Sequence, residues 1–360
     1  MKKLRSILCL ALAVILLAGC APAGGADRNV PTVEFTDSLG RTVQVPEEIT
    51  RVAVTGPLAQ IVVFSAAPEM MVALASDWSE DAQNYIDTEY YDLPVLGQLY
   101  GGNSDMNVEE LAKANPQVII DVGETKTDMA ADMDSVQDQT GIPTVHISAD
   151  LNTMDAAYAM LGDLLGIRDR TDILADWCVS AWARTEEIME AVGEDGKVSV
   201  LYCLGDLGCN VIARGSYHST VLDTVTNNLA VVDTPSSKGS GNEVNMEQML
   251  LWDPEVILFA PNSMYAYVED DPLWQNMTAI QNGNYYEVPY GVYNWMGFPP
   301  SIQRYLGMLW LTELLYPEYT DYDLYEEVSE FYALFFHSGI SREQYDALTA
   351  NSIGKAEARK

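Results

Sequence analysis

Two stretches that share one frame, NVEELAKANPQVII at residues 107–120 and NMEQMLLWDPEVIL at residues 245–258, decide the fold of this 360-residue chain. In each stretch an Asn stands three residues before Glu110 or Gln248, which is the arrangement that caps and opens a helix. Nine residues after that Asn, a proline ends the helix and leads into a short apolar strand. Because the two units lie 138 residues apart and also share a glutamate position, they predict two similar lobes.

Short apolar strands alternate with helical patterns around these two units. The segment at residues 33–45 alternates apolar and polar residues about a glycine turn, which predicts a β-hairpin. Further strands are expected at residues 51–55, 72–75, 118–120, 145–147 and 198–202. This alternation predicts an α/β fold with mainly parallel sheets.

A long helical pattern separates the two predicted lobes. Apolar residues recur at helical spacing in Ile173, Leu174 and Trp177, and the pattern is interrupted only around Gly166. The predicted organisation is a signal at residues 1–20, a tether at 21–30, an N-terminal lobe at 31–165, a connecting helix at 166–194 and a C-terminal lobe at 195–360. Two lobes also suit the length, at roughly 150 residues per domain.

The first twenty residues form an export signal. Three basic residues precede an apolar run of about a dozen residues, shorter than the roughly 20 that span a bilayer. The signal ends in Leu17-Ala18-Gly19-Cys20, a lipobox-like pattern in which Cys20 becomes the lipid-bearing first residue of the mature chain. An ordinary cleavage site that happens to include a cysteine is the alternative. We therefore expect an exported protein, on the outer face of the membrane or in the periplasm, that touches the membrane only through its lipid.

The composition excludes some partners. The formal net charge of −34 makes nucleic acid and anionic lipid poor partners. Cys203 and Cys209 flank a short loop and either form a disulfide outside the cytosol or remain two separate thiols. Three histidines in the whole chain do not predict a site for a bare metal ion, and no cofactor is expected.

At this point the chain resembles a known family. The opening hairpin, the repeated Asn-x-Glu…Pro-x-Val-Ile unit, the lipobox and the long interlobe helix are similar to those of the substrate-binding lipoproteins of ABC importers for iron siderophores, haem and cobalamin. The resemblance implies two Rossmann-like lobes joined by one long rigid α-helix, with ligand bound between them. It also implies a permease and an ATPase as partners, and we expect a monomer.

The repeated glutamates acquire a role from this resemblance. A glutamate on each lobe of such proteins docks onto arginines of the permease, and the matching residues here are Glu109 and Glu247. The alternative is that each is a solvated carboxylate in the first turn of a helix, where the helix dipole favours it.

Ligand contacts are expected in the loops that follow the strands, because open α/β sheets bind ligands beyond the carboxyl ends of their strands. These loops are rich in aromatic residues, which offer flat apolar surface with polar edges. The predicted ligand-binding residues are Pro57, Trp78, Tyr100, Arg214, Tyr217, Tyr265, Tyr267, Tyr293 and Trp295. Arg214 is the candidate for an anionic group of the ligand, with a structural ion pair as the alternative.

The resulting functional prediction is capture of a metal chelate, with a ferric siderophore first and a corrinoid, haem or an oxyanion behind it. The chain carries no HExxH, Walker, GxSxG or Cys-x-x-Cys motif, so an enzyme is not predicted. A two-lobed surface lipoprotein without a transport role is the remaining alternative.

Overall fold

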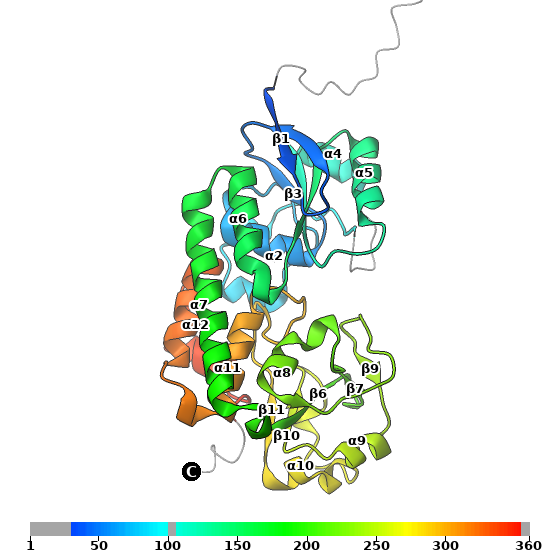
Figure 1. Ribbon diagram of the computed structural model, residues 1–360, viewed down its shortest axis with the longest axis vertical. Helices are drawn as coiled ribbons and strands as arrows, with labels where there is room; N and C mark the ends of the chain where they lie inside the picture. The colour runs from blue at the N-terminus through cyan, green and yellow to red at the C-terminus, as the bar shows by residue number, and fades with distance from the viewer. Residues whose placement is uncertain (1–29, 100–105, 354–360) are drawn as a thin grey trace, which may run out of the picture.

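Two α/β lobes stand one above the other beside a single long helix (Figure 1). The computed structural model describes residues 30–99 and 106–353. The long helix, α7 (Arg168–Val192), runs along both lobes and begins at the end of the helix before it, α6 (Met154–Leu165). The α/β class, the parallel sheets and the one long connecting helix are confirmed.

The first lobe contains a three-stranded parallel sheet in the order β3-β4-β5 and the predicted hairpin β1-β2. The strands β3 and β4 are fully buried, as expected for continuous Val and Ile runs that are covered on both faces. Its elements are β1 (Thr32–Thr36), β2 (Thr42–Pro46), β3 (Val52–Val54), α2 (Pro57–Ala66), α3 (Thr88–Tyr91), α4 (Val108–Ala114), β4 (Val118–Gly123), α5 (Met129–Thr140), β5 (Thr144–Ser148) and α6.

The second lobe is built on a mixed sheet. Strands β11, β10, β6 and β8 pair in parallel, while β7 pairs antiparallel with both β6 and β9. Its elements are β6 (Ser199–Leu204), β7 (Asn210–Val211), α8 (Thr220–Val225), β8 (Asn227–Asn228), β9 (Asn242–Glu243), α9 (Met246–Trp252), β10 (Val256–Phe259), α10 (Thr278–Asn282), β11 (Tyr285–Glu287), β12 (Tyr290–Gly291), β13 (Tyr293–Asn294) and α11 (Arg304–Leu315).

The repeated unit has the same structure in both lobes. The side chain of Asn107 accepts hydrogen bonds at the start of α4, and that of Asn245 does so at the start of α9. Both helices end at a residue in the left-handed conformation, Asn115 and Asp253, followed by the proline that leads into β4 or β10. Polar residues with short side chains tolerate that conformation best after glycine, which explains why the same frame works twice.

The structure lacks one expected strand and distinguishes between the two alternatives for one cysteine pair. Residues 72–75 were expected to form a strand, but they make only isolated bridges, from Leu74 to Val95 and, just before them, from Met71 to Val52. The Cys203 and Cys209 side chains are separate thiols, one buried and one half-buried. Among the described residues, no helix has both the length and the apolar character needed to cross a bilayer.

The C-terminal helices α12 (Leu324–Phe335) and α13 (Arg342–Leu348) return to the first lobe. His337, which follows α12, lies 3.1 Å from the carbonyl oxygen of Phe64 in α2, with the two rings 5.5 Å apart. Gln344 of α13 donates to the carbonyl of Asn84. The end of the chain therefore braces the two lobes beside α7 (Figure 1).

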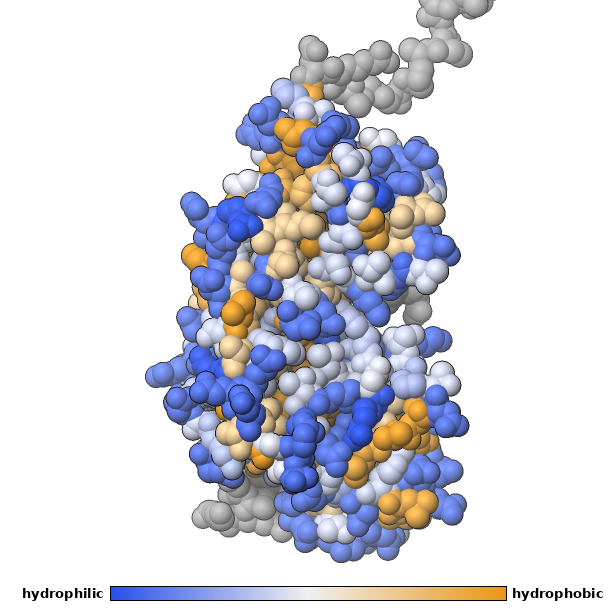
Figure 2. Space-filling view, viewed as in Figure 1, coloured by the Kyte–Doolittle hydropathy of each residue, from blue (hydrophilic) through white to orange (hydrophobic). Residues whose placement is uncertain are grey.

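The face shown in Figure 2 is mostly hydrophilic, as expected from the acidic composition. Apolar surface gathers on it near the N-terminal hairpin and over the lower right of the second lobe. Scattered apolar surface of this kind is normal for a globular protein.

We predict that Phe335→Ala destabilises the protein by about 3–5 kcal/mol, because Phe335 is fully buried against Trp177 of α7 and stacks on Phe331 at 4.5 Å. Urea unfolding followed by tryptophan fluorescence measures this change. Ile173→Ala is the matched control, since Ile173 is an exposed residue on α7 whose truncation should cost about 0.5 kcal/mol or less. Equal losses in the two variants would contradict this account of the brace.

Candidate functional site

Several of the aromatic residues predicted to contact a ligand lie in the protein interior. Trp295 is fully buried, and Trp78 packs edge-on against Phe64 at 5.0 Å while its indole N–H donates to the carbonyl of Tyr90. Tyr293 is buried beside Trp78, with ring centroids 6.1 Å apart. These three residues pack where the lobes meet and present little surface to a ligand in this conformation.

The remaining predicted residues are dispersed. Tyr265 belongs to the core of the second lobe, whereas Tyr267 is exposed to solvent. Pro57 is half-buried at the start of α2. The exposed Arg214 donates from Nη2 to the Oδ1 of Asn227 at 2.6 Å, within its own lobe. Tyr100 and Cys20 lie outside the described residues.

Tyr217 is the predicted residue that does reach across the lobes. Its hydroxyl lies 3.5 Å from the carbonyl oxygen of Ala149, which follows β5 of the first lobe. Its ring faces the guanidinium of Arg304 at 5.2 Å. Burial raises the pKa of Tyr217, and the opposing charges of Arg304, Asp150 and Glu124 also act on it. Groups from both lobes are therefore gathered around this ring.

Arg304 is the most unusual residue of this cluster. It is 1% exposed, yet its contacts are weak: 3.4 Å from Nη1 to the carbonyl of Tyr217 and 3.6 Å from Nη2 to a carboxylate oxygen of Asp150, which is 44% exposed. Its Nε is buried with no hydrogen-bond partner. A buried guanidinium normally has short, charge-assisted hydrogen bonds, so this one has donor capacity left for a ligand.

His218 stands next to Arg304. Its ring stacks on Phe298 with centroids 5.5 Å apart, and its Nδ1 has no hydrogen-bond partner. Burial lowers the pKa of His218, and the nearby positive charge of Arg304 adds to this effect, while backbone groups of Gly297 and Ser237 act in the opposite direction. The ring is thus held neutral, with a polar atom unused inside the cluster.

Two buried hydroxyl groups and two glycines complete the surroundings. The Oγ atoms of Ser216 and Ser301 are buried without partners. Gly297 has φ +114°, and a Cβ there would come within 3.0 Å of the Arg304 side chain. A Cβ on Gly239 would come within 2.7 Å of the Phe298 ring. Glycine at both positions allows the loops to close tightly over Arg304 and His218.

The arrangement suits a negatively charged ligand. It offers a guanidinium, an imidazole and hydroxyl donors in a region of low exposure, where hydrogen bonds to charge are strong. Within residues 30–99 and 106–353, no group of three or more His, Cys, Asp or Glu side chains is placed to hold a metal ion.

Sequence reasoning selected Arg214 and missed Arg304. The available signal was that Arg304 is the only basic residue in residues 301–315, a mostly apolar segment. All of the first nine residues of α11 are buried, so a charge there needs a partner. Periodicity alone could not show that this helix starts at the junction of the lobes.

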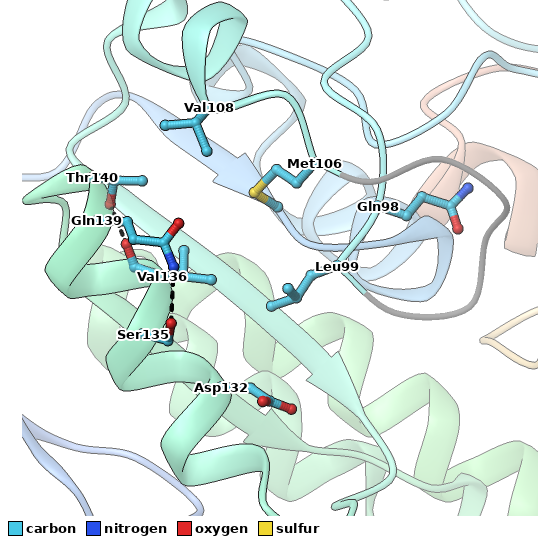
Figure 3. Close-up of a pocket in the computed structure, with 9 residues that line it drawn as sticks. All are labelled: Gln98, Leu99, Met106, Val108, Asp132, Ser135, Val136, Gln139 and Thr140. Carbon is cyan, nitrogen blue, oxygen red and sulfur yellow. Dashed lines mark hydrogen bonds between the residues drawn. The ribbon is translucent and has the colours of Figure 1, made fainter.

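Two open hollows lie elsewhere. One of about 270 Å³ separates α5 from the segments on either side of residues 100–105, with Leu99, Met106 and Val108 facing Ser135 and Val136 (Figure 3). The other, of about 230 Å³, is lined by polar groups after β10 and β11. Neither hollow contains Arg304 or His218. The unsatisfied buried polar groups around Arg304 are the stronger sign of a binding site, because hollows also form where loops pack loosely.

The predicted docking glutamates occupy equivalent positions. Glu109 lies in the first turn of α4 and Glu247 in the first turn of α9, and both are exposed. Each helix lies on the side of its lobe away from α7 (Figure 1). Lys113 approaches Glu109 at 3.5 Å and Glu110 at 2.6 Å.

Comparison with known proteins places these features in context. A family model described as periplasmic binding protein matches residues 66–290. An ABC transporter solute-binding protein from Sulfurospirillum deleyianum is 26% identical with a TM-score of 0.80, over 88% of this chain and 99% of that one. A periplasmic solute-binding protein from Veillonella parvula is 22% identical with a TM-score of 0.73, over 89% and 97%. The Haemophilus influenzae molybdate-binding protein MolA is 20% identical with a TM-score of 0.68, over 86% and 99%. No curated protein sequence matches the chain.

We predict that His218 makes stability fall as the pH drops. Because its folded pKa lies below the ordinary 6.5, the unfolded chain binds a proton that the native state excludes, so the contribution is present above about pH 6.5 and is lost below it. Urea unfolding at pH 7.5 and 5.5 should show a smaller loss in His218→Gln than in the wild type. His337→Gln removes another histidine of lowered pKa and serves as the control. This variant should still show the part of the stability loss that His218 causes. An identical loss in the wild type and His218→Gln would refute the assignment.

Proposed function

Because this chain belongs to the family of periplasmic binding proteins, the substrate-binding components of ABC importers, we propose that it captures an anionic metal compound between its lobes. The observation that supports this cargo is Arg304, a buried guanidinium with only long contacts and an unpartnered Nε. An isolated buried charge is costly, and a bound anion would offset that cost.

Two kinds of cargo satisfy a buried arginine. An anionic ferric siderophore would place a carboxylate or a metal-binding oxygen against Arg304. A compact oxyanion would do the same, and the related MolA is a molybdate-binding protein. We place the ferric siderophore first, because Asp150, His218 and Tyr217 surround Arg304 with groups from both lobes rather than with a closed set of anion donors.

The family places the protein outside the cytoplasm. We further propose that Cys20 carries the lipid that holds it at the membrane face. Delivery would then occur while the protein stays close to its permease, which raises the effective concentration of the two partners.

Docking through Glu109 and Glu247 is part of the same proposal. The two carboxylates belong to identical structural units, one in each lobe, and 82% of the Glu109 side chain is exposed. Exposed charges at a docking surface mainly set the rate and the orientation of association. A permease with one cation opposite each carboxylate would bind best when the distance between the two glutamates matches the distance between its cations.

The cargo prediction is tested by isothermal titration of residues 30–360 with a ferric catecholate, a ferric citrate–dihydroxamate chelate, molybdate, haem and cobalamin. Arg304→Gln should weaken binding of the anionic cargo at least tenfold, because it removes a charge-assisted hydrogen bond. Arg214→Gln is the matched control, since Arg214 is exposed and bonded within its own lobe. Unchanged affinity in Arg304→Gln would exclude this site for the cargo.

The docking prediction uses whole cells. Glu109→Arg with Glu247→Arg should abolish uptake of the cargo while leaving its affinity for the purified protein unchanged, because α4 and α9, which carry these residues, lie apart from α11, which carries Arg304 (Figure 1). Glu186→Arg with Glu187→Arg, on the exposed face of α7, makes the same change of charge elsewhere. Uptake that survives the first pair would rule out docking through these glutamates.

A further inference from the structure

A row of buried polar side chains crosses the sheet of the first lobe. Asp121 on β4 and His146 on β5 are direct neighbours in the parallel pairing, and both are buried. His146 Nδ1 lies 2.7 Å from Asp121 Oδ2, and Thr55, just after β3, donates its hydroxyl to Asp121 Oδ1. On the other side of the ring, His146 Nε2 lies 3.1 Å from the hydroxyl of Thr125. The row therefore ends at an exposed residue.

Hydrogen-bond chemistry gives this row a direction. An ionised carboxylate only accepts, so the imidazole proton belongs on Nδ1, facing Asp121. When the ring carries its single proton on Nδ1, its lone pair is on Nε2, and Thr125 donates its hydroxyl proton to that lone pair. Thr125 is left with only lone pairs to offer outward. Its oxygen is also more electron-rich than a free hydroxyl, because hydrogen bonds in a chain polarise one another.

The exposed end of the row borders the site around Arg304. Thr125 follows β4, whose terminal Gly123 accepts a hydrogen bond from Ala149, and Ala149 contacts the Tyr217 hydroxyl. Glu124, next to Thr125, is close enough for its charge to help raise the pKa of Tyr217, after the larger effect of burial. The loop at residues 123–125 is thus linked to Tyr217 through Ala149, and the charge of Glu124 acts on the Tyr217 ring.

We propose that Thr125 is a cargo-binding residue that accepts a hydrogen bond and that the Asp121–His146 pair holds it in that state. This inference rests on the proposed function and sharpens its cargo. The ligand must present a negative group to Arg304 and an N–H or O–H group to Thr125. Organic iron chelates with carboxylate and amide groups meet both requirements, whereas molybdate at neutral pH offers acceptors alone.

The energetic reason for selection is the cost of an unpaired polar group. A site built to bond a donor discriminates against a ligand that lacks one, because two acceptors then face each other without a proton between them. A purely structural row would need Thr125 only to satisfy Nε2 of the buried His146. That alternative predicts an effect of Thr125 on stability and none on which ligand binds.

The first test determines which ring nitrogen of His146 carries the proton, and it needs no cargo. Histidine labelled with ¹⁵N in the full mature protein gives three ring systems, and His218→Gln and His337→Gln assign them. At pH 7.5 the ring of His146 should carry its proton on Nδ1. A proton on Nε2 would be donated to the Thr125 oxygen, and the Thr125 hydroxyl could then donate to the ligand. That result would overturn the proposal, whatever cargo the protein binds.

The second test compares two probes by titration: a ferric citrate–dihydroxamate chelate, which carries carboxylates and amide N–H groups, and molybdate. The wild type should bind the chelate more tightly. Thr125→Val, which keeps the shape and removes the oxygen, should weaken chelate binding about tenfold and leave molybdate unchanged. Thr125→Ser, which keeps the hydroxyl, should bind the chelate as the wild type does. Thr127→Val serves as the matched control on the same exposed loop.

The outcomes separate this proposal from the proposed function. Loss of binding in Arg304→Gln without loss in Thr125→Val overturns the role of Thr125 and leaves the anionic cargo in place. Equal weakening of both probes by Thr125→Val, or tighter binding of molybdate by the wild type, also overturns it. If neither probe binds, the anionic-cargo proposal fails for these compounds, and the tautomer of His146 alone decides the state of Thr125.

Discussion

The packing of Trp177 holds the molecule together. This residue lies on α7, and its ring meets Phe331 at 5.3 Å and Phe335 at 5.4 Å from α12, as well as Tyr305 of α11 at 6.1 Å. Three helices from different parts of the chain are thereby fixed to one another. Because α7 also runs beside both lobes, the aromatic cluster joins α11 and α12 to the helix that spans the junction (Figure 1). Burial of large aromatic rings stabilises such a junction without the directional demands of a polar network.

The site depends on this fixed junction. Asp150 belongs to the first lobe and Arg304 to the second, so their 3.6 Å contact exists only while the lobes keep their relative position. The same holds for Tyr217 and the carbonyl of Ala149. A binding protein that moves little has lower ordering costs when its ligand arrives, since most of the geometry is already present. The contacts between the lobes thus hold the polar groups around Arg304 in place, next to the aromatic side chains that pack where the lobes meet.

The fold followed closely from local sequence signals, whereas the site followed only in part. Capping residues such as Asn107 and Asn245 act within one helical turn, and the proline frames act within a few residues, so a single sequence reveals them. Tyr217 was found because it lies in a loop after a strand. Trp295 was selected by the same rule, yet it is buried, because an aromatic ring in a loop can pack inward as readily as it can face a ligand. Arg304 became recognisable only through contacts with residues more than eighty positions away, which no local pattern encodes.

The return of the chain end to the first lobe affects the order in which the protein can be built. Phe64 is in the first fifth of the sequence, but its backbone carbonyl meets His337, and its helix packs beside α12. The surface of α2 therefore stays uncovered until nearly all of the chain has been synthesised. An exported protein is threaded through the membrane from its N-terminus, and contacts between distant residues form late because closing long loops costs entropy. The first lobe of a protein that works outside the cytoplasm is accordingly completed there, once α12 and His337 have reached α2.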